Sequence, residues 1–218
     1  KLRLLRSAPA AALLLALGAA PALADTIYMV DGSTLTDVEV VREQLDGVTY
    51  KSKGKSGEDR VDADKVLLIE YRRLPRQVDE AEPLIGDGAI LDGIDTLSQF
   101  VEDVLSGKNR RDRQPWAPGY ALDRILHLRM GIGDLDGVVK AADRLVEKVP
   151  DSRHAPSALL DKAQAQRMQG KGPAAQATLD TLREMIAAKG LSKRWSLELE
   201  LSEVLGNTGL KGQAKRDR

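Results

Sequence analysis

Apolar and polar residues follow two different periods in two parts of the chain. Between residues 26 and 71, runs such as TIYMV, VEVV, GVTYK and VLLIEY are rich in β-branched residues and are separated by polar turns that contain glycine. This pattern is typical of short β-strands. Residues 51–60, KSKGKSGEDR, are polar and glycine-rich and are expected to form a loop between two strands. Strands this short and few favour a small closed or half-closed barrel over residues 25–74.

From residue 88 onward no β-rich run occurs, and the apolar residues recur with helical spacing. In the segment 133–152, GDLDGVVKAADRLVEKVPDS, a single apolar stripe follows one side of the predicted helix: Val138, Ala142, Leu145 and Val149. A lone helix of this length is marginal in water, so its stripe must pack on other helices. We expect the partners to be a helix at about 117–131 and the first helix of the next unit.

Residues 75–87 separate the two patterns. This stretch is charged and contains two prolines, which predicts a linker that leads into the first helix. The whole pattern therefore predicts an α+β protein with a small N-terminal β-barrel and an all-α second part.

The helical part repeats itself. Three glycines, separated by 37 and 39 residues, are each followed five positions later by a small or apolar residue: Gly133 by Val138, Gly170 by Ala175, and Gly209 by Ala214. This rhythm resembles the tetratricopeptide repeat, which has a glycine between its two helices and a proline after the second. Residues 133–152 match best, with Pro150 at the exit. The resemblance implies a solenoid of helical hairpins over residues 88–218, with an incomplete last repeat.

The β-rich part carries a second resemblance. The stretch DTIYMVDGSTLTDVEV, followed later by KVLLIEY, is similar to the small SH3-like or Sm-like barrel that precedes helical repeats in some exported bacterial proteins.

The N-terminus has the pattern of a secretory signal peptide over residues 1–24. Lys1, Arg3 and Arg6 precede a small and apolar run, which ends in Ala22-Leu23-Ala24. The apolar run is shorter than the roughly 20 residues of a membrane span, which favours cleavage after Ala24 over an uncleaved anchor and leaves no transmembrane segment. Because the chain has no cysteine, a disulfide framework and an acylated lipoprotein anchor are excluded. We expect export to a bacterial periplasm.

The net charge and the absence of reactive side-chain motifs limit the classes of function that the sequence supports. Loss of residues 1–24 leaves 30 basic against 33 acidic residues, a formal charge of −3, which argues against nucleic acid as a partner. His127 and His154 are the only histidines and lack metal-ligand spacing, so no metal or cofactor is expected. There is no cysteine nucleophile and no Gly-x-Ser-x-Gly motif, and the carboxylates are not paired in an apolar context. The chain is therefore predicted not to be an enzyme.

The resemblance to tetratricopeptide domains implies a partner-binding groove on the concave face, lined by the first helix of each pair. The positions that fit are Tyr120, Asp123, His127 and Met130 in one unit and Leu160, Gln164 and Arg167 in the next. Trp116 and Trp195 are assigned to packing at helix starts. The preferred function is a non-catalytic periplasmic scaffold that binds a protein or peptide of the cell envelope. The alternative is an envelope assembly element that associates with itself, and an enzyme is a distant third.

Overall fold

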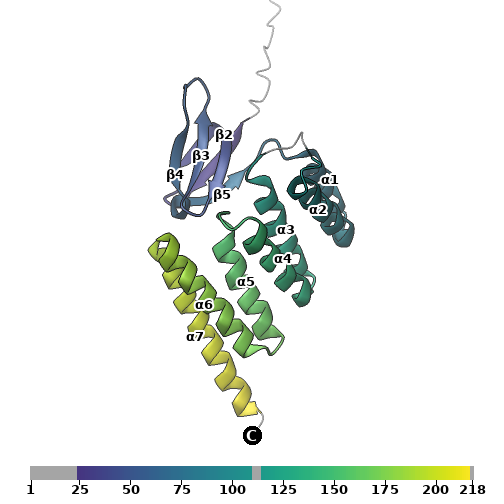
Figure 1. The fold of residues 1–218 in the computed structure, drawn as a ribbon, viewed down its shortest axis with the longest axis vertical. Coiled ribbons are helices and arrows are strands. Elements are labelled where there is room, and N and C mark those ends of the chain that lie inside the picture. The colour runs from purple at the N-terminus through teal and green to yellow at the C-terminus, as the bar shows by residue number, and fades with distance from the viewer. Residues whose placement is uncertain (1–23, 110–113, 217–218) are drawn as a thin grey trace, which may run out of the picture.

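The fold is α+β (Figure 1). The computed structural model describes residues 24–109 and 114–216, with the side chains of the last helix described as far as residue 206. Within these residues, a five-stranded antiparallel sheet is followed by seven α-helices, which confirms the predicted fold class. The predicted signal peptide lies outside the described residues except for Ala24, so it stays a prediction.

The sheet has the strand order β4-β3-β2-β1-β5, so β4 and β5 are its two edges. Its strands are β1 Asp25–Met29, β2 Thr34–Gln44, β3 Gly47–Ser52, β4 Asp59–Asp62 and β5 Val66–Glu70. A short 3₁₀ turn, Ala63–Lys65, joins the two edge strands. The alternation of Val38 and Val40 turns both side chains into the core, as the sequence pattern predicts.

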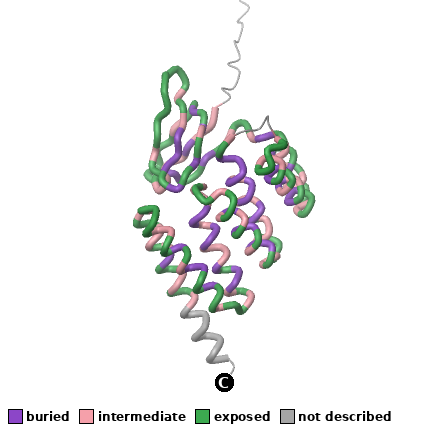
Figure 2. Tube along the Cα trace, viewed as in Figure 1, coloured by how far each residue is buried: buried purple, intermediate pink, exposed green. Residues whose placement is uncertain are grey.

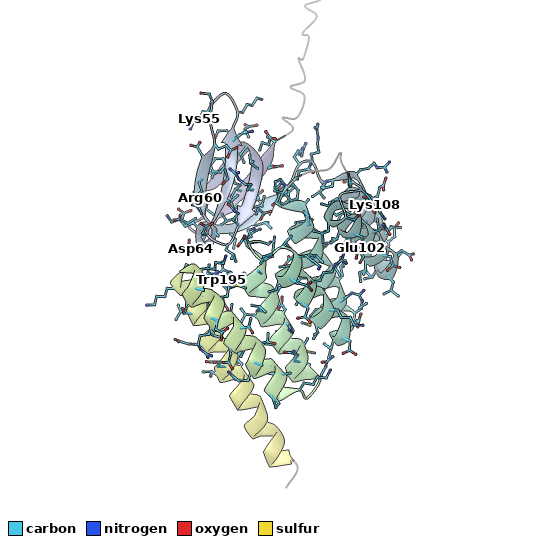
Figure 3. The ribbon with its side chains drawn as sticks, viewed as in Figure 1. Lys55, Arg60, Asp64, Glu102, Lys108 and Trp195 are labelled. Atoms are coloured by element: carbon cyan, nitrogen blue, oxygen red, sulfur yellow. The ribbon has the colours of Figure 1, made fainter. Side chains whose placement is uncertain are left out.

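The predicted loop at 51–60 is shorter in the structure. Asp59 and Arg60 already belong to β4, where they pair with Tyr50 and Thr49 of β3. Strand β4 is mostly exposed and carries polar side chains, because an edge strand needs backbone pairing and not an apolar face to be held in place. A prediction based on hydrophobic alternation therefore misses it. Lys55, at the far end of the sheet from the helices, marks the remaining loop (Figure 3).

The helices follow one another as an array in which each packs on the next. They are α1 Arg76–Gly86, α2 Ile90–Leu105, α3 Ala117–Gly131, α4 Leu135–Lys148, α5 Ala155–Met168, α6 Gly172–Lys189 and α7 Lys193–Arg216. Contacts also join α3 to α5 and α5 to α7, so these three helices form one layer of the array. None of the helices in the described part of the chain has both the length and the apolar character required to cross a membrane.

The linker prediction for residues 75–87 is wrong, because most of this stretch is helix α1. Val78 and Ala81 are fully buried against α2, and Ile85 is partly buried one turn further on. Helix α2 carries Gly93 at this contact, where an added Cβ would lie 2.6 Å from the Ile85 side chain. In the sequence, charged residues separate the apolar residues of α1, and Pro83 argues against a helix. The structure nevertheless accommodates Pro83 within α1.

The stripe on α4 is buried as predicted. Val138, Ala142 and Leu145 are inaccessible to solvent, and Val149 packs partly against the same core. The helix begins at Asp134, whose side chain accepts a hydrogen bond from the Gly137 amide at 2.9 Å. This cap satisfies an amide that the first turn of a helix leaves without a partner.

One hydrophobic core runs from the sheet into the helices, as Figure 2 shows by the buried segments on both sides of their junction. It joins Ile27 and Val48 of the sheet to Phe100 and Leu126 of the helices. A second, smaller core holds α5, α6 and α7 together around Leu179. The sheet and the first helices therefore form one packed body.

Candidate functional site

All seven residues predicted to bind a partner lie on α3 and α5, which are neighbours in the array. The structure divides them into two groups. The α5 members line a groove between α5, α6 and α7, whereas Tyr120, Asp123 and His127 of α3 belong to a network at the junction with the sheet. Met130, one turn beyond His127, is partly buried against the core.

The groove has a volume of about 1160 Å³. Its apolar lining includes Leu160 and Met168 of α5 and Leu201 and Leu205 of α7. Met168 is 60% exposed and Leu201 is 54% exposed, so both side chains are accessible from solvent. Large apolar side chains gathered in a concave region are typical of a binding surface, whereas isolated ones on a convex surface carry no such meaning.

Arg167 lines the groove but is engaged with helix α7. Its Nη1 donates to the Ser202 carbonyl at 2.7 Å, and its Nη2 donates to the Ser202 hydroxyl at 2.6 Å. Gly206 lets the guanidinium lie close to α7, since an added Cβ there would be 2.5 Å from Nη1. Arg167 therefore fastens α7 to α5, while its predicted contact with a partner stays a prediction.

A chain of alternating carboxylates and imidazoles leads from the sheet to this groove. Glu43 of β2 lies 3.8 Å from His154 Nε2, and His154 Nδ1 lies 3.3 Å from Asp123 of α3. Asp123 in turn lies 3.4 Å from His127 Nδ1, and His127 Nε2 is 3.8 Å from Asp161, which lines the groove. Both histidines of the sequence are thus part of one electrostatic network.

The network perturbs its members in opposite directions. Burial pushes the pKa of Asp123 upward, but hydrogen bonds from His127 and His154, together with their charges, outweigh it and hold that pKa well below its usual range. The hydrogen bond to Asp123 raises the pKa of His127 to about 9, against the opposing effect of partial burial. His127 is therefore protonated at neutral pH and forms a fixed positive charge on the exposed face of α3.

Glu43 anchors the sheet end of the network. Its side chain is 1% exposed and accepts hydrogen bonds from the Arg153 guanidinium and the Tyr71 hydroxyl. Nearby, the Leu45 amide donates to the Asp151 carbonyl at 2.9 Å, which ties the β2–β3 turn to the connector between α4 and α5. The sheet is thus held to the middle of the helical array by a buried ion pair and a backbone hydrogen bond.

Aromatic residues complete the junction. Tyr71 stacks on Trp116 with ring centroids 3.8 Å apart, and Tyr120 meets both rings edge-on. Burial raises the pKa of Tyr120. Trp116, 4% exposed, packs at the start of α3 as predicted. Tyr120 takes part in this packing and is partly buried, and its predicted contact with a partner stays a prediction. Trp195 lies near the start of α7 (Figure 3) and is only partly buried. The Arg194 guanidinium lies above its ring.

Sequence reasoning missed Glu43, Tyr71 and Arg153. The ion-paired residues are 110 positions apart, and no local pattern links them. Strand alternation gave no signal for Glu43: counted from Val38 and Val40 it would turn Arg42 inward, but the pairing register shifts between Val40 and Arg42, so Glu43 is the buried residue.

The described side chains of the site supply apolar contact area and charged groups. Within residues 24–109 and 114–216, no cluster of three or more histidine or carboxylate side chains has an arrangement that could hold a metal ion. The carboxylates of the network are used to hold imidazoles and a guanidinium in place.

Comparison with models of protein families gives no match, and comparison with curated proteins gives none either. What the structure defines is a class: an α+β protein with an antiparallel sheet packed on a helical array that carries an open groove.

Proposed function

We propose that this protein is a non-catalytic scaffold of the bacterial periplasm that binds a partner protein or peptide through its tetratricopeptide-like array. The groove between α5, α6 and α7 is the observation that carries the proposal. It combines accessible apolar side chains with polar groups at its edges, which is the composition of surfaces that recognise peptides.

The construction of the groove also suits binding. Arg167 fixes α7 against α5, and Leu179 and Leu199 form the core beneath the groove. A surface held in place before binding loses less conformational entropy when it meets its partner.

Affinity capture tests the proposal. The purified chain is incubated with an envelope extract, beside a variant that combines Met168→Glu with Leu201→Glu. Both side chains are exposed, so the fold should tolerate the changes. The matched control combines Leu67→Glu with Leu91→Glu, which replaces equally exposed apolar residues of β5 and α2 outside the groove.

We expect a protein that is retained by the parent chain and by the control and is lost from the groove variant. Equal retention by all three would place binding elsewhere and would contradict the proposal.

Export is part of the proposal and has its own test. Expression in a bacterium, followed by N-terminal sequencing of the protein from the periplasmic fraction, should yield a chain that begins at Asp25, because the Ala-x-Ala pattern ends at Ala24. A protein that retains Lys1 would contradict cleavage.

One observation favours a second function, self-association. Leu197 and Val204 of α7 are 54% and 58% exposed and do not line the groove, so the apolar stripe that they share with Leu201 and Leu205 extends beyond the groove. Light scattering would detect an oligomer that grows with concentration. Leu197→Glu combined with Val204→Glu should abolish it, whereas a monomer at all concentrations would exclude this function.

A further inference from the structure

We infer that the groove takes a basic amphipathic segment, in which an arginine or lysine side chain lies beside apolar residues. This inference rests on the proposed function and adds the chemistry of the partner. The hydrogen-bonding groups and the volume of the groove carry it.

Asp161 of α5 is the first of these groups. Its side chain is 27% exposed, and its nearest cationic group, His127 Nε2, lies 3.8 Å away, beyond hydrogen-bond distance. The same imidazole is already held by Asp123 on its other nitrogen. Burial is the largest effect on Asp161 and raises its pKa. A donor supplied by a ligand would stabilise this carboxylate.

Glu198 of α7 is the second group. Its nearest cation is Arg194, one turn earlier on the same helix and 4.0 Å away. Glu203 also lines the groove, but its carboxylate is already bonded to Arg183. Two carboxylates on opposite walls, Asp161 and Glu198, are therefore able to accept hydrogen bonds from a bound segment.

Cationic groups are scarcer than carboxylates in the described part of the groove. Among the described residues that line it, Arg167 is the only lysine or arginine, and Ser202 occupies two of its nitrogens. An acidic segment would bring its carboxylates next to Asp161 and Glu198 without gaining a cation, whereas a guanidinium or ammonium would meet two acceptors. Charge complementarity thus selects a basic partner.

The volume and the apolar walls define the rest of the segment. An α-helix with side chains is about 10–12 Å wide and rises 5.4 Å per turn, so one turn fills on the order of 500 Å³. A groove of about 1160 Å³ therefore accommodates about two turns. Leu160 and Met168 on one wall face the α7 leucines on the other, which suits apolar side chains repeated every three or four residues.

The test uses a display library of random 16-residue peptides, selected on the full chain at moderate ionic strength. Selected peptides are expected to be enriched in arginine or lysine beside leucine, isoleucine, methionine or phenylalanine. Their affinity, measured by fluorescence anisotropy, should fall about five- to tenfold with Glu198→Gln and by a similar factor with Asp161→Asn. Glu147→Gln, which removes an exposed carboxylate on α4 outside the groove, is the matched control and should leave affinity unchanged.

The outcomes separate the inference from the proposed function. Acidic peptides, or basic peptides that bind equally well to the Asp161→Asn and Glu198→Gln variants, would overturn the inference. If such peptides were still lost with Met168→Glu and Leu201→Glu, the groove would remain a binding site of different chemistry. Failure to select any peptide would also overturn the inference, and the capture experiment would then decide the proposed function separately.

Discussion

Removal of the Glu43 side chain should destabilise the protein far more than loss of a neighbouring surface ion pair. Glu43→Ala leaves the Arg153 guanidinium, whose side chain is only 18% exposed, without its carboxylate, and leaves the Tyr71 hydroxyl without an acceptor. Breaking a buried pair by removing one partner costs about 3–5 kcal/mol. The residual exposure of Arg153 places this case at the lower end, so we expect a loss of about 3 kcal/mol in the free energy of unfolding.

Glu58→Ala is the matched control. It removes the same side chain from an ion pair with Arg42 of β2, at an exposed position in the loop before β4, and should cost less than about 1 kcal/mol. A double variant, Glu43→Leu with Arg153→Met, separates the charge effect from packing. Replacement of a buried ion pair by apolar side chains of similar volume is often neutral, so this variant should recover most of the stability.

Urea denaturation followed by tryptophan fluorescence measures all three variants. Trp116 reports on the junction because it stacks on Tyr71, and a Trp195→Phe background removes the second tryptophan. A cost of less than 1 kcal/mol for Glu43→Ala, equal to that of Glu58→Ala, would refute the reasoning and show that the junction is held by the apolar core alone.

Three further predictions follow from other parts of the structure. The folded-state pKa of His127, about 9, exceeds the ordinary value of 6.5, so the stability that its protonation contributes is complete below pH 6.5 and is lost as pH rises through 9. The melting temperature should therefore fall less between pH 6 and pH 9.5 for His127→Gln than for the parent chain. Gly93→Ala should cost about 1–3 kcal/mol because its Cβ meets Ile85, whereas Gly86→Ala, in open space on α1, should be neutral or stabilising in the same melts. Arg167→Ala should speed amide hydrogen exchange in α7 and leave exchange in the sheet unchanged, since that side chain joins α7 to α5.

The elements that the sequence predicts are those whose apolar pattern can be recognised within the element itself. The stripe of α4 is visible because an amphipathic helix repeats its apolar residues every three or four positions, and those residues are buried in the structure. Helix α1 and strand β4 were missed because charged residues interrupt their apolar positions and neighbouring elements hold them in place. The residues that stabilise them lie on α2 and β3, outside the short stretch of sequence from which each element would be predicted.

The same distinction applies to the candidate site. The three α5 residues predicted to bind a partner line one groove, because helical periodicity fixes which residues share a face; that they bind a partner stays a prediction. Sequence reasoning assigned Tyr120 and Asp123 to that surface too, although the sheet draws them into the junction. The deciding residues, Glu43 and Tyr71, come from a different part of the chain and reach α3 only through tertiary packing.

The attachment of the sheet to the connector between α4 and α5 has a consequence for how the molecule unfolds. In an array whose units contact only their neighbours, unfolding can begin at either end and proceed unit by unit. Here the Leu45–Asp151 and Glu43–Arg153 contacts close a loop of more than a hundred residues, which makes the sheet and helices α1 to α5 a single cooperative unit. Helices α6 and α7, which pack around the smaller core, lie outside this closed loop, so we expect their amides to exchange faster than those of the rest. The groove thus lies between α5, which belongs to the more stable part, and helices α6 and α7, which belong to the more labile part. A bound segment would contact both parts and stabilise the labile one.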